Sequence, residues 1–386
     1  MKQVLVFLFL SVLLAACGSA ASATATIPVP TVTLVVPVTP SPSNIILSPE
    51  PSPTLLTPLE GYGPSNFPSN VNPLTGLKVT TPALLERRPL SVKVANQRDI
   101  RPQWGLSLAD IVFEYYNQEG TSRFNALFYG QDSEMVGSIR SARFFDIPVI
   151  RGYKAVFAFG SAYDKVIRRL YNSEFANRLV LETPTSPLKR YDPNGSDLLW
   201  VNTAELSAYI TARGVENGRQ NLDGMQFKTE APAGGQPGNQ VYVRFSGAFY
   251  SRWDYDSTAG EYLRFSDTVN DYDKQNEQYT QLTDRLTNQP ISAANVVVLL
   301  VTYEYYDKDA DVVDVLFTGS GKAVAFRDGQ AYLVKWQRND MDVVSLTYDD
   351  GSAFSLKPGN TWYEVMGTSS TIQQTPQGWR YTHLIP

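Results

Sequence analysis

The chain has 386 residues, enough for two domains, and 43% of them are hydrophobic, so at least one core can form. Its formal net charge is -5 and its pI is about 5.2. This acidic balance excludes broad electrostatic binding to nucleic acid or to an anionic membrane, but it allows a local basic pocket.

The N-terminus has the pattern of a bacterial lipoprotein signal peptide. Lys2 is followed by an apolar run over 4–14, which is too short to span a bilayer comfortably and indicates a signal peptide over 1–16. The run ends in LAAC, which resembles a lipobox, where cleavage precedes a cysteine that is then lipidated. Cys17 is the only cysteine, so no disulfide can form within the chain. We expect Cys17 to carry a lipid such as palmitate and to anchor an extracytoplasmic protein; the alternative is an ordinary secreted protein.

Residues 17–70 are rich in Pro, Thr and Ser, and no charged residue lies between Lys2 and Glu50. Proline blocks helices and strand ladders, and few large side chains are present to bury. We therefore predict an extended linker with polyproline character that separates a folded head from the membrane.

The next segment, 71–215, is predicted to be a mixed α/β domain. RPLSVKVAN (88–96) is typical of a strand, and 111–128 is typical of a hairpin around Glu119-Gly120. With a two-residue turn, Ile111 faces Phe128 and Tyr115 faces Phe124. One face is then apolar and the other displays Glu114, Asn125 and Arg123.

Two helices are expected later in this segment. Residues 153–172 indicate a strand, a Gly-Ser turn and a helix with Ser161 as its N-cap. Residues 202–214 indicate a second helix, capped at Asn202 or the next residue and stopped by Gly214.

Residues 216–240 are Gly-rich and poor in apolar residues, which predicts a linker or long loop. From 241 to 386 the pattern is one of short strands separated by Gly and Asp turns, typical of a small barrel or sandwich. The predicted fold class is α+β: a mixed α/β N-terminal domain followed by a mostly antiparallel β domain.

Several stretches together resemble the YerB-like bacterial lipoproteins. The N-terminal ones are NPLTGL, RPLSVKVAN, RPQWGLSLADIVFEY, TSRFNALF and GSIRSAR, and the C-terminal ones are DVLFTGSGKAVAF and LKPGNTWYEV. The resemblance implies an extracytoplasmic lipoprotein with an α/β domain and a β-rich domain. It implies no assigned biochemical role and no agreed catalytic residues.

The residue inventory argues against several kinds of chemistry. His383 is the only histidine and lies near the C-terminus, so a catalytic triad or a histidine-based zinc site is not expected. No Walker or Rossmann fingerprint is present, and no cofactor or metal is predicted. DKDAD (307–311) is similar to the start of a calcium loop, but Val312 and Thr318 stand where Gly and Glu are needed. We predict an acidic hairpin turn there.

GSIRSARFFD (137–146) predicts a helix from about Ile139 that ends before Pro148. Arg140 and Arg143 then share one face in the first turn, where cations oppose the helix dipole. Their positive charge would be neutralised either by carboxylates of the protein, such as Glu114 or Asp146, or by a bound anion.

These patterns lead to two functional hypotheses. The first is a binding or scaffolding protein of the cell envelope whose partner is a wall polymer or an envelope protein, and not nucleic acid. Its ligand site would comprise Arg140, Arg143, Arg123, Glu114, Asn125 and Asn96. The alternative is a peptidoglycan hydrolase in which Glu114 works with a second carboxylate, since glycosidases need two carboxyl groups about 5–9.5 Å apart across a cleft. The sequence leaves open whether the protein is an enzyme.

Overall fold

The computed structural model describes residues 61–192 and 199–385. The predicted signal peptide, Cys17 and most of the predicted linker lie outside these residues. In the described part of the chain, no helix is long and apolar enough to cross a membrane.

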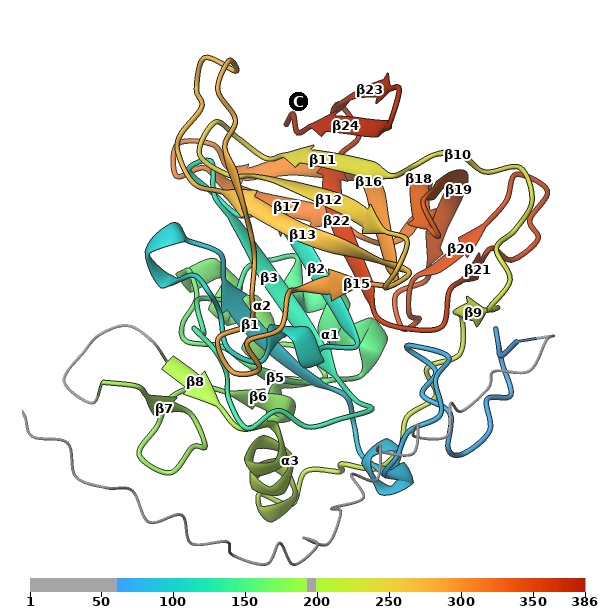
Figure 1. The fold of residues 1–386 in the computed structure, drawn as a ribbon. Coiled ribbons are helices and arrows are strands. Elements are labelled where there is room, and N and C mark those ends of the chain that lie inside the picture. The colour runs from blue at the N-terminus through green and yellow to red at the C-terminus, as the bar shows by residue number, and fades with distance from the viewer. Residues whose placement is uncertain (1–60, 193–198, 386) are drawn as a thin grey trace, which may run out of the picture. The chain divides into compact units, whose positions relative to one another are not determined.

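The described residues confirm the predicted α+β class, with the helices confined to the first half (Figure 1). The helices are α1 (Asp146–Tyr153), α2 (Asp164–Tyr171) and α3 (Thr203–Ala212). The strands of the first half are β1 (Leu90–Ala95), β2 (Ile111–Tyr116), β3 (Ser122–Phe128), β4 (Val136–Gly137), β5 (Val156–Ala158), β6 (Leu179–Val180), β7 (Lys189–Arg190) and β8 (Leu199–Val201). The later strands are β9 (Gln226–Phe227), β10 (Gln236–Pro237), β11 (Gln240–Arg244), β12 (Tyr250–Asp256), β13 (Glu261–Asp267), β14 (Tyr279–Gln281), β15 (Ser292–Ala293), β16 (Asn295–Asp307), β17 (Val312–Leu316), β18 (Gly319–Arg327), β19 (Gln330–Arg338), β20 (Ser345–Thr347), β21 (Ser355–Leu356), β22 (Thr361–Gly367), β23 (Thr371–Thr375) and β24 (Gly378–Thr382).

One large sheet contains strands from both halves of the chain. Its order is β10-β19-β18-β16-β22-β2-β3-β1-β5-β6, with β17 paired to β16 and β20 paired to β19. The link between the halves is β22, which runs parallel to β2 on one side and to β16 on the other. The division into domains over 71–215 and 241–386 stays a prediction, because hydrogen-bonded strands join the two segments.

A second sheet, in the order β14-β13-β12-β11-β24-β23 with β15 paired to β13, covers one face of the large sheet. Trp253 of β12 packs edge to face on Trp362 of β22, with ring centroids 5.1 Å apart. Both indoles are almost fully buried, so the core between the two sheets lies at this contact.

The predicted register of the β2–β3 hairpin is wrong by one residue. Ile111 pairs with Leu127 and Tyr115 with Arg123, and residues 117–121 form a longer loop than the two-residue turn. Side chains alternate across a strand, so a shift by one residue changes which residues share a face. Glu114 therefore lies on the face opposite Asn125 and Arg123.

The helix predicted from Ile139 is also wrong. Ile139 and its neighbours run beside β1, where the Ala95 N–H donates to the Ser138 carbonyl at 2.9 Å and the Arg140 N–H donates to the Lys93 carbonyl at 3.0 Å. Helix α1 begins only at Asp146. Pro148 lies in its first turn, where no intrahelical bond to the proline nitrogen is needed.

The other two helices were predicted correctly in place, but one cap was not. Helix α2 begins after Tyr163, which makes no side-chain capping bond, so the prediction of Ser161 as N-cap is wrong. Helix α3 is capped by Asn202, whose side chain accepts a hydrogen bond from the Glu205 N–H at 3.1 Å. Gly214 follows it with a φ of 71°, the left-handed conformation that ends helices.

Candidate functional site

The predicted site residues fall into two clusters on opposite faces of the sheet formed by β1, β2 and β3. Arg123 and Asn125 lie on the face that contacts Ser141 and Asp146, at the start of α1. Glu114 and Asn96 lie on the face covered by the second sheet. The structure therefore does not bring these two pairs together.

The first cluster is built on Asp146, the first residue of α1. Its Oδ1 accepts hydrogen bonds from the Tyr115 hydroxyl at 2.8 Å and the Asn125 amide at 2.9 Å, and from the Lys93 ammonium at 3.3 Å. Its Oδ2 accepts the backbone N–H of Arg143 at 2.7 Å. All four side chains of this group are buried. Both carboxylate oxygens of Asp146 already accept hydrogen bonds from within the protein, as buried polar atoms usually do.

Two arginines near this group, Arg123 and Arg143, bond to neutral acceptors. Arg123 donates to the Ser141 carbonyl at 2.7 Å, and Arg143 donates to the Ala142 carbonyl at 2.9 Å and the Gln118 side chain at 2.7 Å. Neither guanidinium forms an ion pair within the described residues, and the buried Nε of Arg143 has no hydrogen-bond partner there. We call Arg123, Arg140 and Arg143 the arginine cluster.

Positive charge accumulates in this region. Burial lowers the pKa of Arg123 to about 9; the like charges of Arg143 and Arg140 act in the same direction, while Tyr115 and Asp146 oppose the shift. Burial also lowers the pKa of Lys93 to about 7; Asp146 opposes this shift, while Arg123 and Arg143 add to it. The cations thus repel one another in a partly dehydrated place, an arrangement that an additional anion would relieve.

Because the pKa of Lys93 is lowered in the folded protein, we expect the free energy of unfolding to depend on pH. Between pH 7 and 10.5 the unfolded chain holds a proton on this lysine that the folded protein has lost, so stability should rise with pH across this window. The gain over a Lys93→Met variant should approach about 1.4 kcal/mol per pH unit. Urea unfolding of both proteins at pH 7, 8 and 9 measures it. Parallel pH profiles would show that Lys93 titrates normally.

The second cluster centres on a buried arginine that the sequence did not single out. Arg264 of β13 donates to Glu114 Oε2 at 2.6 Å and to Glu364 Oε1 at 3.1 Å. Glu114 Oε1 also accepts bonds from Asn96 at 3.0 Å and Ser122 at 2.6 Å. Arg264 thus joins β13 to β2 and β22, and we call Glu114, Arg264 and Glu364 the Glu-Arg-Glu triad.

The triad is enclosed by aromatic rings and excluded from water. The Arg264 guanidinium carbon lies 4.7 Å from the Trp362 ring centroid and 5.1 Å from that of Trp253. Burial, and then the charge of Glu114, raise the pKa of Glu364 to about 8. Glu114 is 2% exposed and Glu364 is fully buried, with an arginine between them. This leaves no open cleft in which a sugar ring reaches both carboxylates.

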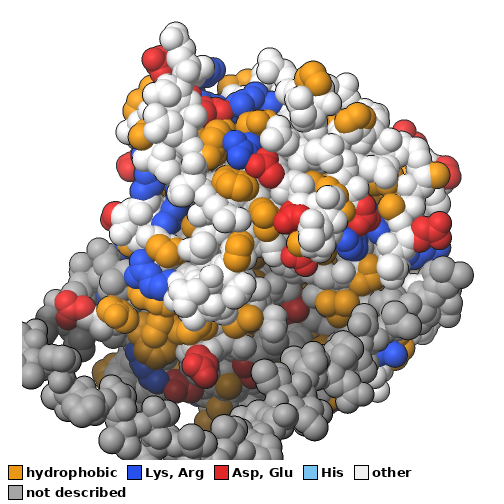
Figure 2. Space-filling model, in the orientation of Figure 1, with side chains coloured by type: hydrophobic (Ala, Val, Ile, Leu, Met, Phe, Trp, Pro, Cys, Tyr) orange, Lys and Arg blue, Asp and Glu red, His pale blue; other side chains and the backbone are white. Residues whose placement is uncertain are grey.

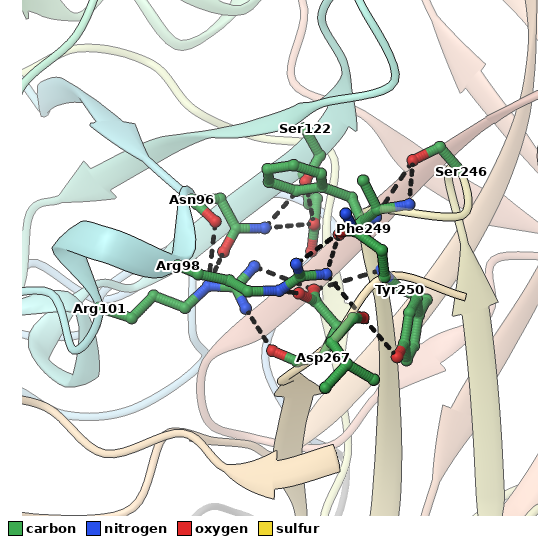
Figure 3. A network of polar contacts seen from close by, with 12 residues as sticks. Asn96, Arg98, Arg101, Ser122, Ser246, Phe249, Tyr250 and Asp267 are labelled. Atoms are coloured by element: carbon green, nitrogen blue, oxygen red, sulfur yellow. Dashed lines mark hydrogen bonds and ion pairs between the residues drawn. The ribbon is translucent and has the colours of Figure 1, made fainter. Parts of the chain in front are cut away.

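Asn96 connects the triad to a further network (Figure 3). Arg101 donates to the Asn96 carbonyl at 2.9 Å and to its side-chain oxygen at 3.0 Å, and pairs with Asp267 at 3.1 Å. Asp267 also pairs with Arg98. These contacts tie the segment after β1 to β13, which gives Asn96 a structural role between the two sheets.

His383 and the acidic segment 307–311, for which the sequence predicted no catalytic or metal-binding role, lie away from these clusters. His383 is buried, its Nδ1 accepts the Gly367 N–H at 3.1 Å, and burial lowers its pKa to about 3. Residues 307–311 connect β16 to β17, as the predicted hairpin turn requires. In the described ranges, no three His, Cys, Asp or Glu residues gather in a way that fits a metal ion.

Lys93, Arg264 and Glu364 were missed by sequence reasoning. Their common signal is a charged residue inside an otherwise apolar or aromatic strand, as in SVKVA and WYEVM. Such residues are rarely buried unless a partner meets them, so each one marks a tertiary contact.

Comparisons with known proteins agree with this architecture. Residues 74–216 match the family described as "Protein of unknown function (DUF3048) N-terminal domain", and residues 241–363 match the corresponding C-terminal domain. The chain is 28% identical over 313 residues to "Putative lipoprotein YerB" of Bacillus subtilis (strain 168), covering 76% of this chain and 85% of that protein. The crystal structure of YerB from Bacillus subtilis superposes with a TM-score of 0.66 at 26% identity, covering 77% of this chain and 96% of that one. The chain therefore belongs to the YerB-like family, which pairs the two DUF3048 domains and has no assigned function.

Proposed function

We propose that this protein is a lipid-anchored, extracytoplasmic binding protein of the bacterial cell envelope, and that its arginine cluster holds an anionic group of a wall polymer or a partner protein. The LAAC motif at Cys17 and the lipoprotein relative support the anchor. The relative also supports the location in the envelope.

The observation that carries the binding site is the state of Arg123 and Arg143. Both are partly buried, both bond only to neutral acceptors among the described residues, and the charge of Arg143 helps to lower the pKa of Arg123. A carboxylate or phosphate would add charge-assisted bonds to two planar guanidinium groups. Asp146 cannot supply them, because its oxygens are taken by Lys93, Tyr115, Asn125 and a backbone N–H.

The site must act locally and not through the charge of the whole protein. On the face shown in Figure 2, basic and acidic side chains are interspersed among neutral surface, and neither sign dominates. A net charge of -5 gives no general attraction to a polyanion. Recognition of an anionic polymer therefore depends on short-range contacts with particular arginines.

Binding to purified cell walls tests the proposal. The full-length protein, kept soluble in detergent, is sedimented with wall sacculi that retain their anionic polymers. Arg123→Gln/Arg143→Gln should reduce the bound fraction at least tenfold, because two charge-assisted contacts are lost. Raising the salt concentration should weaken the wild type more than the variant.

A matched control separates the site from net charge. Lys322 and Lys335 face each other across β18 and β19, and both are exposed. Lys322→Gln/Lys335→Gln removes the same charge and should bind as the wild type does. Equal recovery of the wild type and the arginine variant would refute the arginine cluster as the binding site.

The hydrolase alternative gains no support from the geometry. Both carboxylates of the Glu-Arg-Glu triad are buried and share Arg264, so neither is placed to protonate a glycosidic oxygen.

A further inference from the structure

Two exposed tyrosines lie next to the arginine cluster. Tyr163, just before α2, is 36% exposed and Tyr306, near the end of β16, is 45% exposed. The Tyr306 ring packs against Phe144 with centroids 4.8 Å apart. Partial desolvation and the charges of Asp307 and Tyr306 raise the pKa of Tyr163, so the two tyrosines lie within electrostatic range of each other.

The same short segment carries both the arginines and the support for the tyrosines. Phe144, beneath Tyr306, directly follows Arg143 in the chain. Ser141, whose carbonyl accepts a bond from Arg123, shares a hydrogen bond of 2.7 Å with Ser161 through their hydroxyls. Ala142 and Ala162 form a parallel β-bridge, so the next residues, Arg143 and Tyr163, follow side by side in the two segments.

The position of Tyr306 also depends on an irregularity in β16, the strand that carries it. The register of β16 with β17 shifts between Tyr305 and Asp307, so Tyr306 is the extra residue of a β-bulge. Bulges turn a side chain away from the regular alternation. At the turn after the bulge, Asp311 accepts the Tyr116 hydroxyl at 2.7 Å, and the loop after Tyr116 carries Gln118, the partner of Arg143. The bulge and the arginine cluster are thus held by one set of contacts.

We infer that the arginine cluster, Tyr163 and Tyr306 together bind an acidic glycan, a sugar chain that bears carboxylate or phosphate groups. This inference rests on the proposed function and names its ligand class. The weakly polar C–H face of a sugar ring packs on an exposed aromatic ring, whose hydroxyl stays in contact with water. The guanidinium groups take the acidic substituent in charge-assisted bonds. An anion without a sugar ring would use only the arginines.

Calorimetric titration of the full-length protein in detergent tests this inference with four probes. A muramic-acid-containing tetrasaccharide carries rings and carboxylates, and glucose 1-phosphate carries a ring and a phosphate. Chitotetraose carries similar rings without charge, and inorganic phosphate carries charge without a ring. We expect at least one of the two acidic sugars to bind at least tenfold more tightly than both chitotetraose and inorganic phosphate. The better acidic sugar identifies the substituent.

Variants separate the contribution of the tyrosines from that of the arginines. Tyr163→Ala/Tyr306→Ala should weaken binding of the acidic sugar at least tenfold and leave the affinity for inorganic phosphate unchanged. Tyr171→Ala/Tyr272→Ala removes two tyrosines that are 52% and 71% exposed elsewhere, and should bind as the wild type does. Arg123→Gln/Arg143→Gln should weaken the binding of every anionic probe.

The outcomes distinguish a failure of glycan binding from a failure of the proposed anion site. If the tyrosine variant binds the acidic sugars normally while the arginine variant fails, the glycan inference is overturned and the anion site stands. If inorganic phosphate binds as tightly as the acidic sugars, the inference is likewise overturned. If the arginine variant binds every anionic probe normally, the proposed anion site falls as well.

Discussion

Replacing Glu114 with glutamine is expected to destabilise the protein by about 3–5 kcal/mol, the cost of leaving a buried charge without its partner. Glu114 accepts three hydrogen bonds, including one from Arg264 at 2.6 Å, and the arginine has no route to water. An amide supplies no negative charge and points N–H groups at other donors. Urea unfolding at pH 7, followed by Trp fluorescence, gives the free energy of unfolding from its midpoint and slope.

Glu364→Gln is the matched control for this experiment. Because the pKa of Glu364 is raised to about 8, its carboxyl is mostly protonated at pH 7, and an amide is a close substitute for it. The altered hydrogen bond should cost no more than about 1 kcal/mol. At pH 7 this cost is outweighed, because ionisation of Glu364 stabilises the unfolded wild type and not the unfolded variant. Equal losses in the two variants would mean that the charge of the triad is not concentrated on Glu114.

The second large effect is the pH dependence of the difference between the wild type and Glu364→Gln. The folded protein keeps the Glu364 proton up to about pH 8, whereas the unfolded chain releases it near its ordinary pKa of 4.5. The folded state therefore binds more protons between these values, and the stability of the wild type falls as pH rises. Relative to the variant, the fall should approach about 1.4 kcal/mol per pH unit.

Urea unfolding of both proteins at pH 5, 6, 7 and 8 measures this slope. Comparing them at each pH cancels the titration of other groups, including His383 and Lys93, whose pKa values are lowered by burial. The difference should level off above pH 8. A difference independent of pH would contradict a raised pKa for Glu364 and would place the triad's proton elsewhere.

Local patterns predicted much of the secondary structure. The strand at 88–96, the two hairpin strands within 111–128 and helix α3 with its Asn202 cap follow from residue type and spacing. These features depend on neighbours in the chain, so a sequence reading captures them. The loop between β2 and β3 was harder, since several loop lengths fit the same residues.

The candidate site was predicted less well than the fold. Arg123, Arg140 and Arg143 do lie near one another, but the helix that was to hold the last two does not begin until Asp146. Glu114 was assigned the wrong face by a register error of one residue, and its partner Arg264 comes 150 residues later. No local pattern connects two residues so far apart.

Composition and short motifs in the sequence were enough to predict a lipoprotein signal with Cys17, the α+β class and the family, and they mark the proline-rich segment directly. Long-range contacts in the folded protein were needed to show that β22 joins the two halves in one sheet, that Glu114 belongs to a buried triad, and that Tyr306 packs on Phe144, the residue after Arg143. The physical reason is that burial and charge pairing depend on which strands become neighbours. Strand pairing is settled by long-range packing, and a one-residue change in register moves every side chain to the other face.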